Sequence, residues 1–234
     1  MLISITTGVT LEAELQHPPT YNGSSTDATA SKLAILLHPW SWLGGQMNDP
    51  VLQALSRTLL KRDYHVLKFN SRGVGQSTGW SSLTGVSEGK DLEALVQWAL
   101  TNIANVESLV LVGYSHGSLI TSRHPTLPKP LQTYHVLLSY PLGVRGLITL
   151  FRTGSYATSL TALLHDPTSN VLIVYGTQDE FTSEQSYDSW AEKLRSEVGD
   201  GPGRLEMHKV DGANHFWIGD ARRQLTGLIE GWVP

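Results

Sequence analysis

Short runs of consecutive apolar residues recur along the chain. The run Leu33–Leu37 contains no polar residue, and Val171–Tyr175 is built in the same way. An uninterrupted apolar run of this length is typical of a strand that is covered on both faces. Residues 2–15 alternate instead and are interrupted at Thr7-Gly8, which predicts a short antiparallel hairpin. Further strands are predicted over 33–37, 64–69, 108–114, 134–140, 171–175 and 205–210.

Apolar residues between these runs recur at helical spacing. The pair Asp49-Pro50 is typical of a helix start, because aspartate caps free N–H groups and proline fits the first helical position. The stretch 141–170 has a mixed pattern and predicts no defined element. Helices are predicted after Asp49-Pro50, from Ser87, after Ser115 and after a capping box formed by Thr182 and Gln185. A final helix carries Leu225, Leu228, Ile229 and Trp232 on one face.

Strands and helices therefore alternate through most of the chain. This order predicts an α/β fold with a mainly parallel, twisted sheet of about eight strands, helices on both faces and right-handed crossovers. The length of 234 residues fits a single domain over residues 1–234. Sites in open parallel sheets lie beyond the carboxyl ends of the strands, so we expect chemistry in the loops that follow them.

One of these loops carries the pattern Gly-x-Ser-x-Gly at Gly113-Tyr114-Ser115-His116-Gly117. It follows a predicted strand and precedes a predicted helix, as in a turn that holds a serine in a strained conformation. The glycines leave room for close backbone approach, so the Ser115 hydroxyl is expected above the edge of the sheet. The pattern also occurs in ordinary glycine-rich turns, so it needs partner residues to be meaningful.

Suitable partners follow two later strands. Asp179 and His215 come after Ser115 in the order nucleophile, acid, base. A serine hydroxyl is a weak nucleophile at neutral pH, so it needs a base within hydrogen-bond reach and a group that orients the base. We expect His215 to take the proton of Ser115 and Asp179 to orient His215. Asp211 and Asp166 compete with Asp179 for the role of the acid.

An acyl-transfer site also needs hydrogen-bond donors for the negatively charged oxygen of the intermediate. The sharp turn points the backbone N–H of His116 at the space where this oxygen forms. The second donor is expected in the loop after the strand 33–37. The backbone N–H of Trp40 is the first candidate there and that of Ser41 the second.

Five other residues near strand ends have two interpretations each. The aromatic residues Trp42, Phe181 and Trp217 are candidates for lining a substrate pocket, although aromatic residues in such places usually pack in the core. His38 is interpreted as a structural loop histidine rather than a second base. Arg72 is interpreted as a residue that fixes its own tight turn rather than as a binding site for an anion.

The composition narrows the classes of partner. The formal net charge is −4 and no long basic block is present, so neither nucleic acid nor an anionic membrane is expected as a partner. The absence of cysteine excludes disulfides and thiolate chemistry. No apolar run is long enough for a membrane span, and the N-terminal residues lack the features of a signal peptide, so a cytoplasmic protein is expected.

Motifs for metals and cofactors are weak. The zinc motif His-Glu-x-x-His is absent, and Gly73-Val74-Gly75 lacks the third glycine of a dinucleotide-binding fingerprint. We therefore expect no metal and no cofactor, and a small-molecule acyl substrate as the partner. Whether the chain is a monomer or a homodimer stays open.

With these residues in place, the chain resembles the α/β-hydrolase superfamily, and within it the small branch without a cap domain that is related to dienelactone-hydrolase-like proteins. The resemblance implies Ser115 as nucleophile, Asp179 as acid and His215 as base. Ser115 stands where dienelactone hydrolases proper carry cysteine, which favours a plain serine esterase. Pro39 stands where many relatives carry glycine. The matching segments are His38-Pro39 with Gly44-Gly45, residues 70–77, residues 113–117, residues 176–179 and residues 214–216.

The leading hypothesis is a serine hydrolase that cleaves a small carboxylic ester or thioester through an acyl-enzyme. The alternative is a catalytically silent protein of the same fold that acts as a binding or scaffold module. A third hypothesis keeps the three residues but uses them for lyase or carbon–carbon bond cleavage. Fold alone does not decide between these hypotheses.

Overall fold

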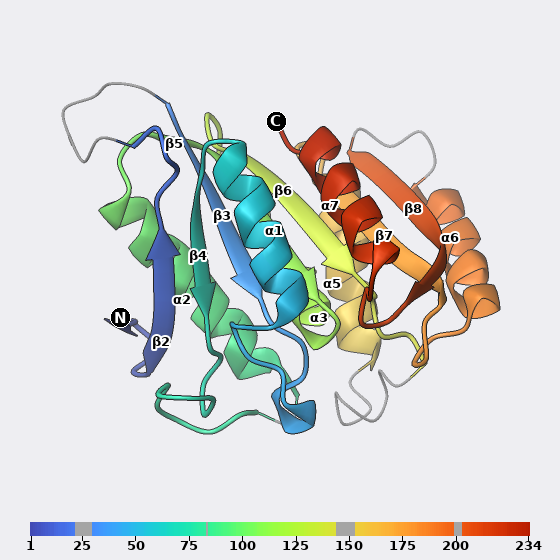
Figure 1. Cartoon of the computed structure of the whole chain (residues 1–234), viewed down its shortest axis with the longest axis horizontal. Helices are drawn as coiled ribbons and strands as arrows, with labels where there is room; N and C mark the ends of the chain where they lie inside the picture. Colours follow the sequence, from blue (N-terminus) through green and yellow to red (C-terminus); the bar gives the residue numbers. More distant parts are fainter. Residues whose placement is uncertain (22–29, 83, 144–152, 199–202) are drawn as a thin grey trace.

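The computed structural model describes residues 1–21, 30–82, 84–143, 153–198 and 203–234. The described strands form an eight-stranded sheet in the order β1-β2-β4-β3-β5-β6-β7-β8 (Figure 1). β1 and β2 pair antiparallel with each other, and β2 pairs antiparallel with β4; all later pairings are parallel. The strands are β1 Leu2–Ser4, β2 Thr10–Gln16, β3 Ser31–Leu37, β4 Tyr64–Phe69, β5 Val106–Tyr114, β6 Gln132–Leu138, β7 Asn170–Gln178 and β8 Arg204–Asn214.

Helices cover both faces of this sheet. α1 and α7 pack side by side on one face, and α2, α3, α5 and α6 lie on the other (Figure 1). The side chain of Asp49 accepts a hydrogen bond from the N–H of Val51 and so caps α1, with Pro50 at the first helical position. The described helices are α1 Pro50–Lys61, α2 Val86–Asn102, α3 His116–Thr121, α5 Thr153–His165, α6 Glu184–Val198 and α7 Asp220–Trp232, with a short 3₁₀ turn over Ser41–Leu43.

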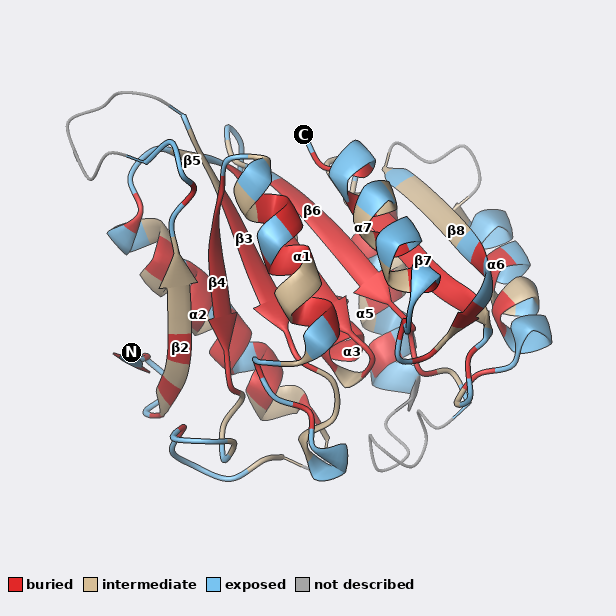
Figure 2. Cartoon of the chain, viewed as in Figure 1, coloured by how far each residue is buried: buried red, intermediate tan, exposed pale blue. Residues whose placement is uncertain are grey.

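The apolar runs are buried because alternate side chains serve two different cores. In β5, Val110 and Val112 face α1 and α7, whereas Leu109 and Leu111 face α2. The central strands are buried along most of their length (Figure 2). An interior strand that faces helices on both sides has no solvent-facing position, so its sequence reads as an apolar run rather than as an alternation.

These findings confirm the predicted fold class, and within the described residues no large cap domain interrupts the connection from β6 to β7. Two details differ from the sequence-based expectation. A helix, α5, occupies part of the stretch 141–170 for which no element was predicted, and residues 144–152 of that stretch lie outside the described residues. α6 is capped by the hydroxyl of Ser183, which accepts from the N–H of Ser186 at 3.2 Å, and not by Thr182. The hydroxyl of Thr182 accepts from the N–H of Gly143 instead.

The single-domain assignment of residues 1–234 stays a prediction. Among the described helices, none combines the length and the apolar character needed to cross a bilayer.

The burial of β5 predicts a large difference between two leucine truncations. Leu111 is fully buried in the sheet, whereas Leu2 is 57% exposed. Leu111→Ala leaves a cavity and is expected to lower the free energy of unfolding by about 2–5 kcal/mol. Leu2→Ala is the matched control and is expected to change it by less than about 0.5 kcal/mol. Urea unfolding at equilibrium measures both, and similar losses at the two positions would contradict this account of the core.

Candidate active site

The turn between β5 and α3 holds Ser115 in an unusual backbone conformation. Its φ is 54° and its ψ is −118°, a strained combination for a residue with a side chain. The glycines on either side are required by close backbone contacts. A Cβ atom on Gly113 would lie 2.3 Å from the carbonyl oxygen of Gly117, and one on Gly117 would lie 2.6 Å from that of Leu37. The spacing Gly-x-Ser-x-Gly is therefore a steric requirement of this turn.

The structure brings together the three side chains that sequence analysis grouped. The Nε2 atom of His215 lies 3.0 Å from Oγ of Ser115, and its Nδ1 atom lies 2.8 Å from Oδ2 of Asp179. Ser115, Asp179 and His215 directly follow β5, β7 and β8, whose carboxyl ends reach the same edge of the sheet. All three residues are at most 8% exposed. A histidine in this position can accept the serine proton while its other nitrogen donates to the carboxylate.

The carboxylate of Asp179 has hydrogen-bond donors on both oxygens. Oδ1 accepts from the backbone N–H groups of Phe181 and Thr182, at 2.9 and 3.0 Å. The hydroxyl of Tyr187 donates to Oδ2 at 3.4 Å, and burial together with the charge of Asp179 raises the pKa of Tyr187 well above its usual value. These donors fix the carboxylate so that it presents Oδ2 to His215.

The two carboxylates that compete with Asp179 in the sequence, Asp166 and Asp211, form hydrogen bonds elsewhere in the structure. Asp166 accepts from the hydroxyls of Thr126 and Thr168. Asp211 accepts from the hydroxyl of Thr177. Among the described contacts, neither carboxylate reaches the imidazole of His215.

Two further residues hold the backbone of His215, and sequence analysis did not identify them. The N–H of His215 donates to Oε2 of Glu180 at 2.8 Å, and its carbonyl accepts from the hydroxyl of Tyr114 at 2.8 Å. Both neighbour a residue that was identified, since Tyr114 precedes Ser115 and Glu180 follows Asp179. That adjacency was the available signal, but sequence does not reveal that their side chains turn toward His215.

The loop after β3 lies against the start of α3. Gly45 closes this loop, because its N–H donates to the carbonyl of Trp40 and a Cβ atom on it would lie 2.1 Å from the carbonyl oxygen of Pro39. Within the described residues, the backbone N–H groups of Trp40 and His116 have no hydrogen-bond acceptor. Two unpartnered N–H groups beside a serine hydroxyl are available to a ligand oxygen.

The His38 side chain connects this loop to the loop after β4 through hydrogen bonds. Its Nε2 atom accepts from the N–H of Ser71 at 3.0 Å, so its Nδ1 atom carries the proton and donates to the carbonyl of Pro39 at 2.6 Å. Burial lowers the pKa of His38 to about 4. Burial, together with the charge on His38, likewise lowers the pKa of His116 to about 4. Both rings are therefore uncharged at neutral pH, and His38 has the structural role that sequence analysis assigned to it.

A cavity of about 530 Å³ opens beside Ser115 and His215. Of the three aromatic residues predicted to line a pocket, Phe181 does so. Trp217 does not, because it is fully buried in the core and its Nε1–H donates to the hydroxyl of Ser139. Trp42 is also outside the lining and stacks its exposed ring on Trp40. The lining residues that sequence analysis missed include Leu43, Asp49 and Phe216.

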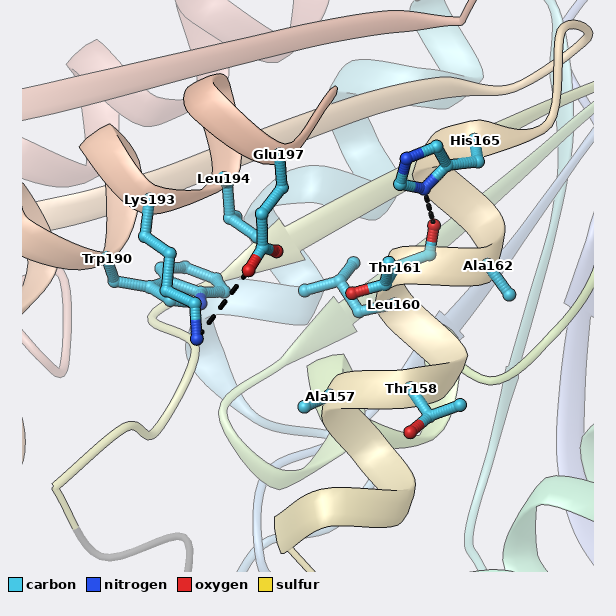
Figure 3. Close-up of a pocket in the computed structure, with 10 residues that line it drawn as sticks. All are labelled: Ala157, Thr158, Leu160, Thr161, Ala162, His165, Trp190, Lys193, Leu194 and Glu197. Carbon is cyan, nitrogen blue, oxygen red and sulfur yellow. Dashed lines mark hydrogen bonds and ion pairs between the residues drawn. The ribbon is translucent and has the colours of Figure 1, made fainter. Parts of the chain in front are cut away.

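A second cavity, of about 560 Å³, lies between α5 and α6 (Figure 3). Its lining includes Leu160 and His165 from α5 and Trp190, Lys193 and Glu197 from α6. The figure shows Lys193 paired with Glu197, and His165 bonded to the carbonyl of Thr161 within its own helix. No residue of the Ser115 site contributes to this cavity.

An ion pair between Arg72 and Asp91 lies outside the site. The guanidinium of Arg72 forms two hydrogen bonds of 2.6 Å to the carboxylate of Asp91 in α2, so it fixes its own loop as predicted. Over the described part of the chain, no group of three or more histidine, aspartate or glutamate side chains is arranged to hold a metal ion.

The comparisons with known proteins agree with this fold. Residues 40–124 match a family model described as the alpha/beta hydrolase fold. "Uncharacterized protein C959.06c" from Schizosaccharomyces pombe is 25% identical over 207 residues, which cover 88% of this chain and 87% of that protein.

Two solved structures are similar over nearly the whole chain. An alpha-beta serine hydrolase homologue from Coxiella burnetii is 27% identical with a TM-score of 0.72, and the match covers 99% of this chain and 95% of the other. XC6422 from Xanthomonas campestris, described as an a/b serine hydrolase without lid, is 23% identical with a TM-score of 0.71, covering 100% and 94%. These matches and the sheet topology show that the chain has the α/β-hydrolase fold.

The buried imidazole of His38 predicts a pH dependence of stability. Its pKa is about 4 in the folded protein and about 6.5 in a solvated imidazole. Between these values the unfolded chain binds more protons, so the free energy of unfolding falls as the pH falls from 6.5 toward 4, by about 1.4 kcal/mol per pH unit for one proton. His38→Asn keeps a donor for the Pro39 carbonyl but does not titrate. It is expected to reduce this slope by up to one proton.

Urea unfolding at a series of pH values between about 4.5 and 7 measures the slope. His116 and the buried His135, whose pKa is lowered to about 3, contribute to the wild-type slope in the same sense. Ser196→Ala, at an exposed position whose side chain does not titrate in this range, is the control and should leave the slope unchanged. An unchanged slope in His38→Asn would mean that His38 is not held uncharged by burial.

Proposed function

We propose that the protein is a serine hydrolase that cleaves carboxylic esters or thioesters through an acyl-enzyme. The observation that carries this proposal is the continuous contact from Oγ of Ser115 through the imidazole of His215 to the carboxylate of Asp179, at 3.0 and 2.8 Å. The strained turn at Ser115 and the two unpartnered N–H groups beside it support the same reaction.

The first half of the reaction transfers the acyl group to the protein. The Oγ atom of Ser115 attacks the ester carbonyl carbon while Nε2 of His215 takes the hydroxyl proton. The carbonyl oxygen gains a negative charge and accepts hydrogen bonds from the N–H groups of Trp40 and His116. The bond to the leaving oxygen or sulfur then breaks, and the imidazolium returns its proton to that atom.

The second half repeats these steps with water. His215 takes a proton from a water molecule, whose oxygen attacks the acyl carbon, and Ser115 leaves with the proton from the imidazolium. The carboxylate of Asp179 stabilises the imidazolium in both halves and keeps its ring in place. Glu180 and Tyr114 position His215 through hydrogen bonds to its backbone. The sequence of steps uses only the named groups and water.

A catalytically silent binding protein of the same fold is the second candidate. That alternative calls for His215 to point away from Ser115, and the 3.0 Å contact between them counts against it. A lyase or carbon–carbon bond cleavage would use the same three residues, so assays with different substrates separate it from ester hydrolysis. We favour ester hydrolysis because the two unpartnered N–H groups suit a tetrahedral acyl intermediate.

The proposal predicts that a fluorophosphonate probe labels Ser115 covalently. Labelling is expected in the wild type and absent in Ser115→Ala, as measured by gel fluorescence and intact mass. With p-nitrophenyl acetate, Ser115→Ala and His215→Ala are each expected to lower kcat by roughly 10⁶-fold. Asp179→Asn is expected to lower it by roughly 10⁴-fold, since the carboxylate orients the base without reacting.

Ser196→Ala is the matched control, because Ser196 is an exposed serine on α6 that bonds only within its helix. It should be labelled like the wild type. A wild-type protein that is not labelled, or a Ser115→Ala variant labelled equally well, would rule out Ser115 as the nucleophile.

A further inference from the structure

The cavity at Ser115 opens onto a surface of exposed apolar side chains. Leu43 is 70% exposed and Phe216 is 49% exposed, and both line the cavity. The indole ring of Trp42 stacks on that of Trp40, with ring centroids 6.1 Å apart and planes at 14°. We call Trp40, Trp42, Leu43, Phe181 and Phe216 together the apolar rim. A continuous apolar surface that reaches a binding site marks contact with an apolar ligand.

The apolar rim begins at the reacting atoms. The ring of Phe181 meets the imidazole of His215 edge-on at 4.6 Å, and the ring of Phe216 follows at 6.2 Å from that of Phe181. Trp40 and Leu43 come from the loop after β3 and line the same cavity as Ser115. A chain attached to an ester carbonyl at Ser115 therefore leaves the site along apolar side chains that come from separate loops.

The charge around the cavity favours an uncharged ligand. No lysine or arginine occurs among its described lining residues, and Asp49 adds a carboxylate to them. The charge of Arg222 acts on the pKa of Asp49, but the Arg222 side chain is not part of the described lining. The Asp49 side chain accepts from the N–H of Val51 and is held in place as the cap of α1. A fixed carboxylate in a cavity with apolar walls opposes a second negative charge there.

We propose, resting on the serine hydrolase function above, that the substrate is an ester with an extended, uncharged apolar chain that lies across the apolar rim. The chain belongs to the acyl group or to the alcohol, since rim residues line the cavity that both parts of the ester enter. A neutral chain of several methylene groups would cover the exposed apolar side chains and would bring no negative charge close to the carboxylate of Asp49. A small polar acyl group would not cover the apolar rim, whose side chains would stay exposed to water.

The first test is a chain-length series. The acyl arm uses p-nitrophenyl esters from acetate to octanoate, and the alcohol arm uses acetates of alcohols from methanol to octanol, all below their micelle concentrations. A fully buried methylene group raises binding about fourfold, so on an open rim that covers about half of it we expect about twofold each. In the arm whose chain lies on the rim, kcat/KM should rise roughly 50-fold over the six methylene groups of the acyl series, or roughly 100-fold over the seven of the alcohol series.

The variants connect this rise to the rim. Leu43→Ala combined with Phe216→Ala should reduce the octanoate-to-acetate ratio, or the octyl-to-methyl ratio, at least about fivefold. Both side chains are exposed, so their truncation leaves the core intact, and each single variant should give part of the effect. Trp80→Ala is the matched control, because Trp80 is 89% exposed and is not among the residues that line the cavity. It should leave both ratios unchanged.

A charged analogue tests the role of Asp49. The p-nitrophenyl monoester of suberic acid has the chain length of the octanoate but ends in a carboxylate. We expect it to react at least about tenfold more slowly than the octanoate at pH 8 and the difference to narrow in Asp49→Asn, since asparagine caps a helix about as well as aspartate.

The outcomes separate this inference from the function on which it rests. Ser115 labelled and acetate hydrolysed, but with no rise in either arm, would overturn the inference and leave the hydrolase standing. A rise that the double variant leaves unchanged, or a suberate ester as fast as the octanoate, would also overturn it. A wild-type protein without labelling or hydrolysis would overturn both proposals together.

Discussion

The close approach between the turn at Ser115 and the end of β3 is the constraint on which the rest of the site depends. Gly117 lies so near the carbonyl of Leu37 that no Cβ atom fits between them. This contact sets the start of α3 directly against the loop that contains Trp40, where the N–H groups of Trp40 and His116 have no acceptor among the described residues. A larger residue at Gly113 or Gly117 would separate the two loops and with them the two donors.

Strain of this kind needs a rigid support. A non-glycine residue at positive φ costs about 1–3 kcal/mol, and it persists only where the surroundings determine its conformation. β5 supplies that support, because it pairs with β3 on one side and β6 on the other and is buried between two helical layers. The N–H of Ser115 itself continues the pairing by donating to the carbonyl of Leu138 at 2.9 Å. The sheet therefore holds the strained residue from both sides.

Much of this arrangement could be predicted from sequence, for an identifiable physical reason. Apolar runs identify buried strands, parallel strands bring their carboxyl ends to one edge, and Ser115, Asp179 and His215 each follow such a run. The proximity of Ser115 and His215 could thus be predicted from the strand order, although the two residues are 100 positions apart in sequence. The direction of side chains within loops could not be predicted, because loops lack the regular periodicity that shows which way side chains point in helices and strands.

The residues after β8 illustrate that limit and its consequence. Trp217 adopts a positive φ of 51° and donates from its backbone N–H to the carbonyl of Asn214, which closes a tight turn around His215. The turn directs the indole of Trp217 into the core against α1 and α7 and leaves Phe216 half-exposed at the cavity. Sequence analysis named Trp217 as a candidate for the pocket, with the core as the alternative; the structure places Trp217 in the core and Phe216 in the lining of the cavity. Because the buried indole anchors the loop, Trp217 still serves the site by fixing the backbone that follows His215.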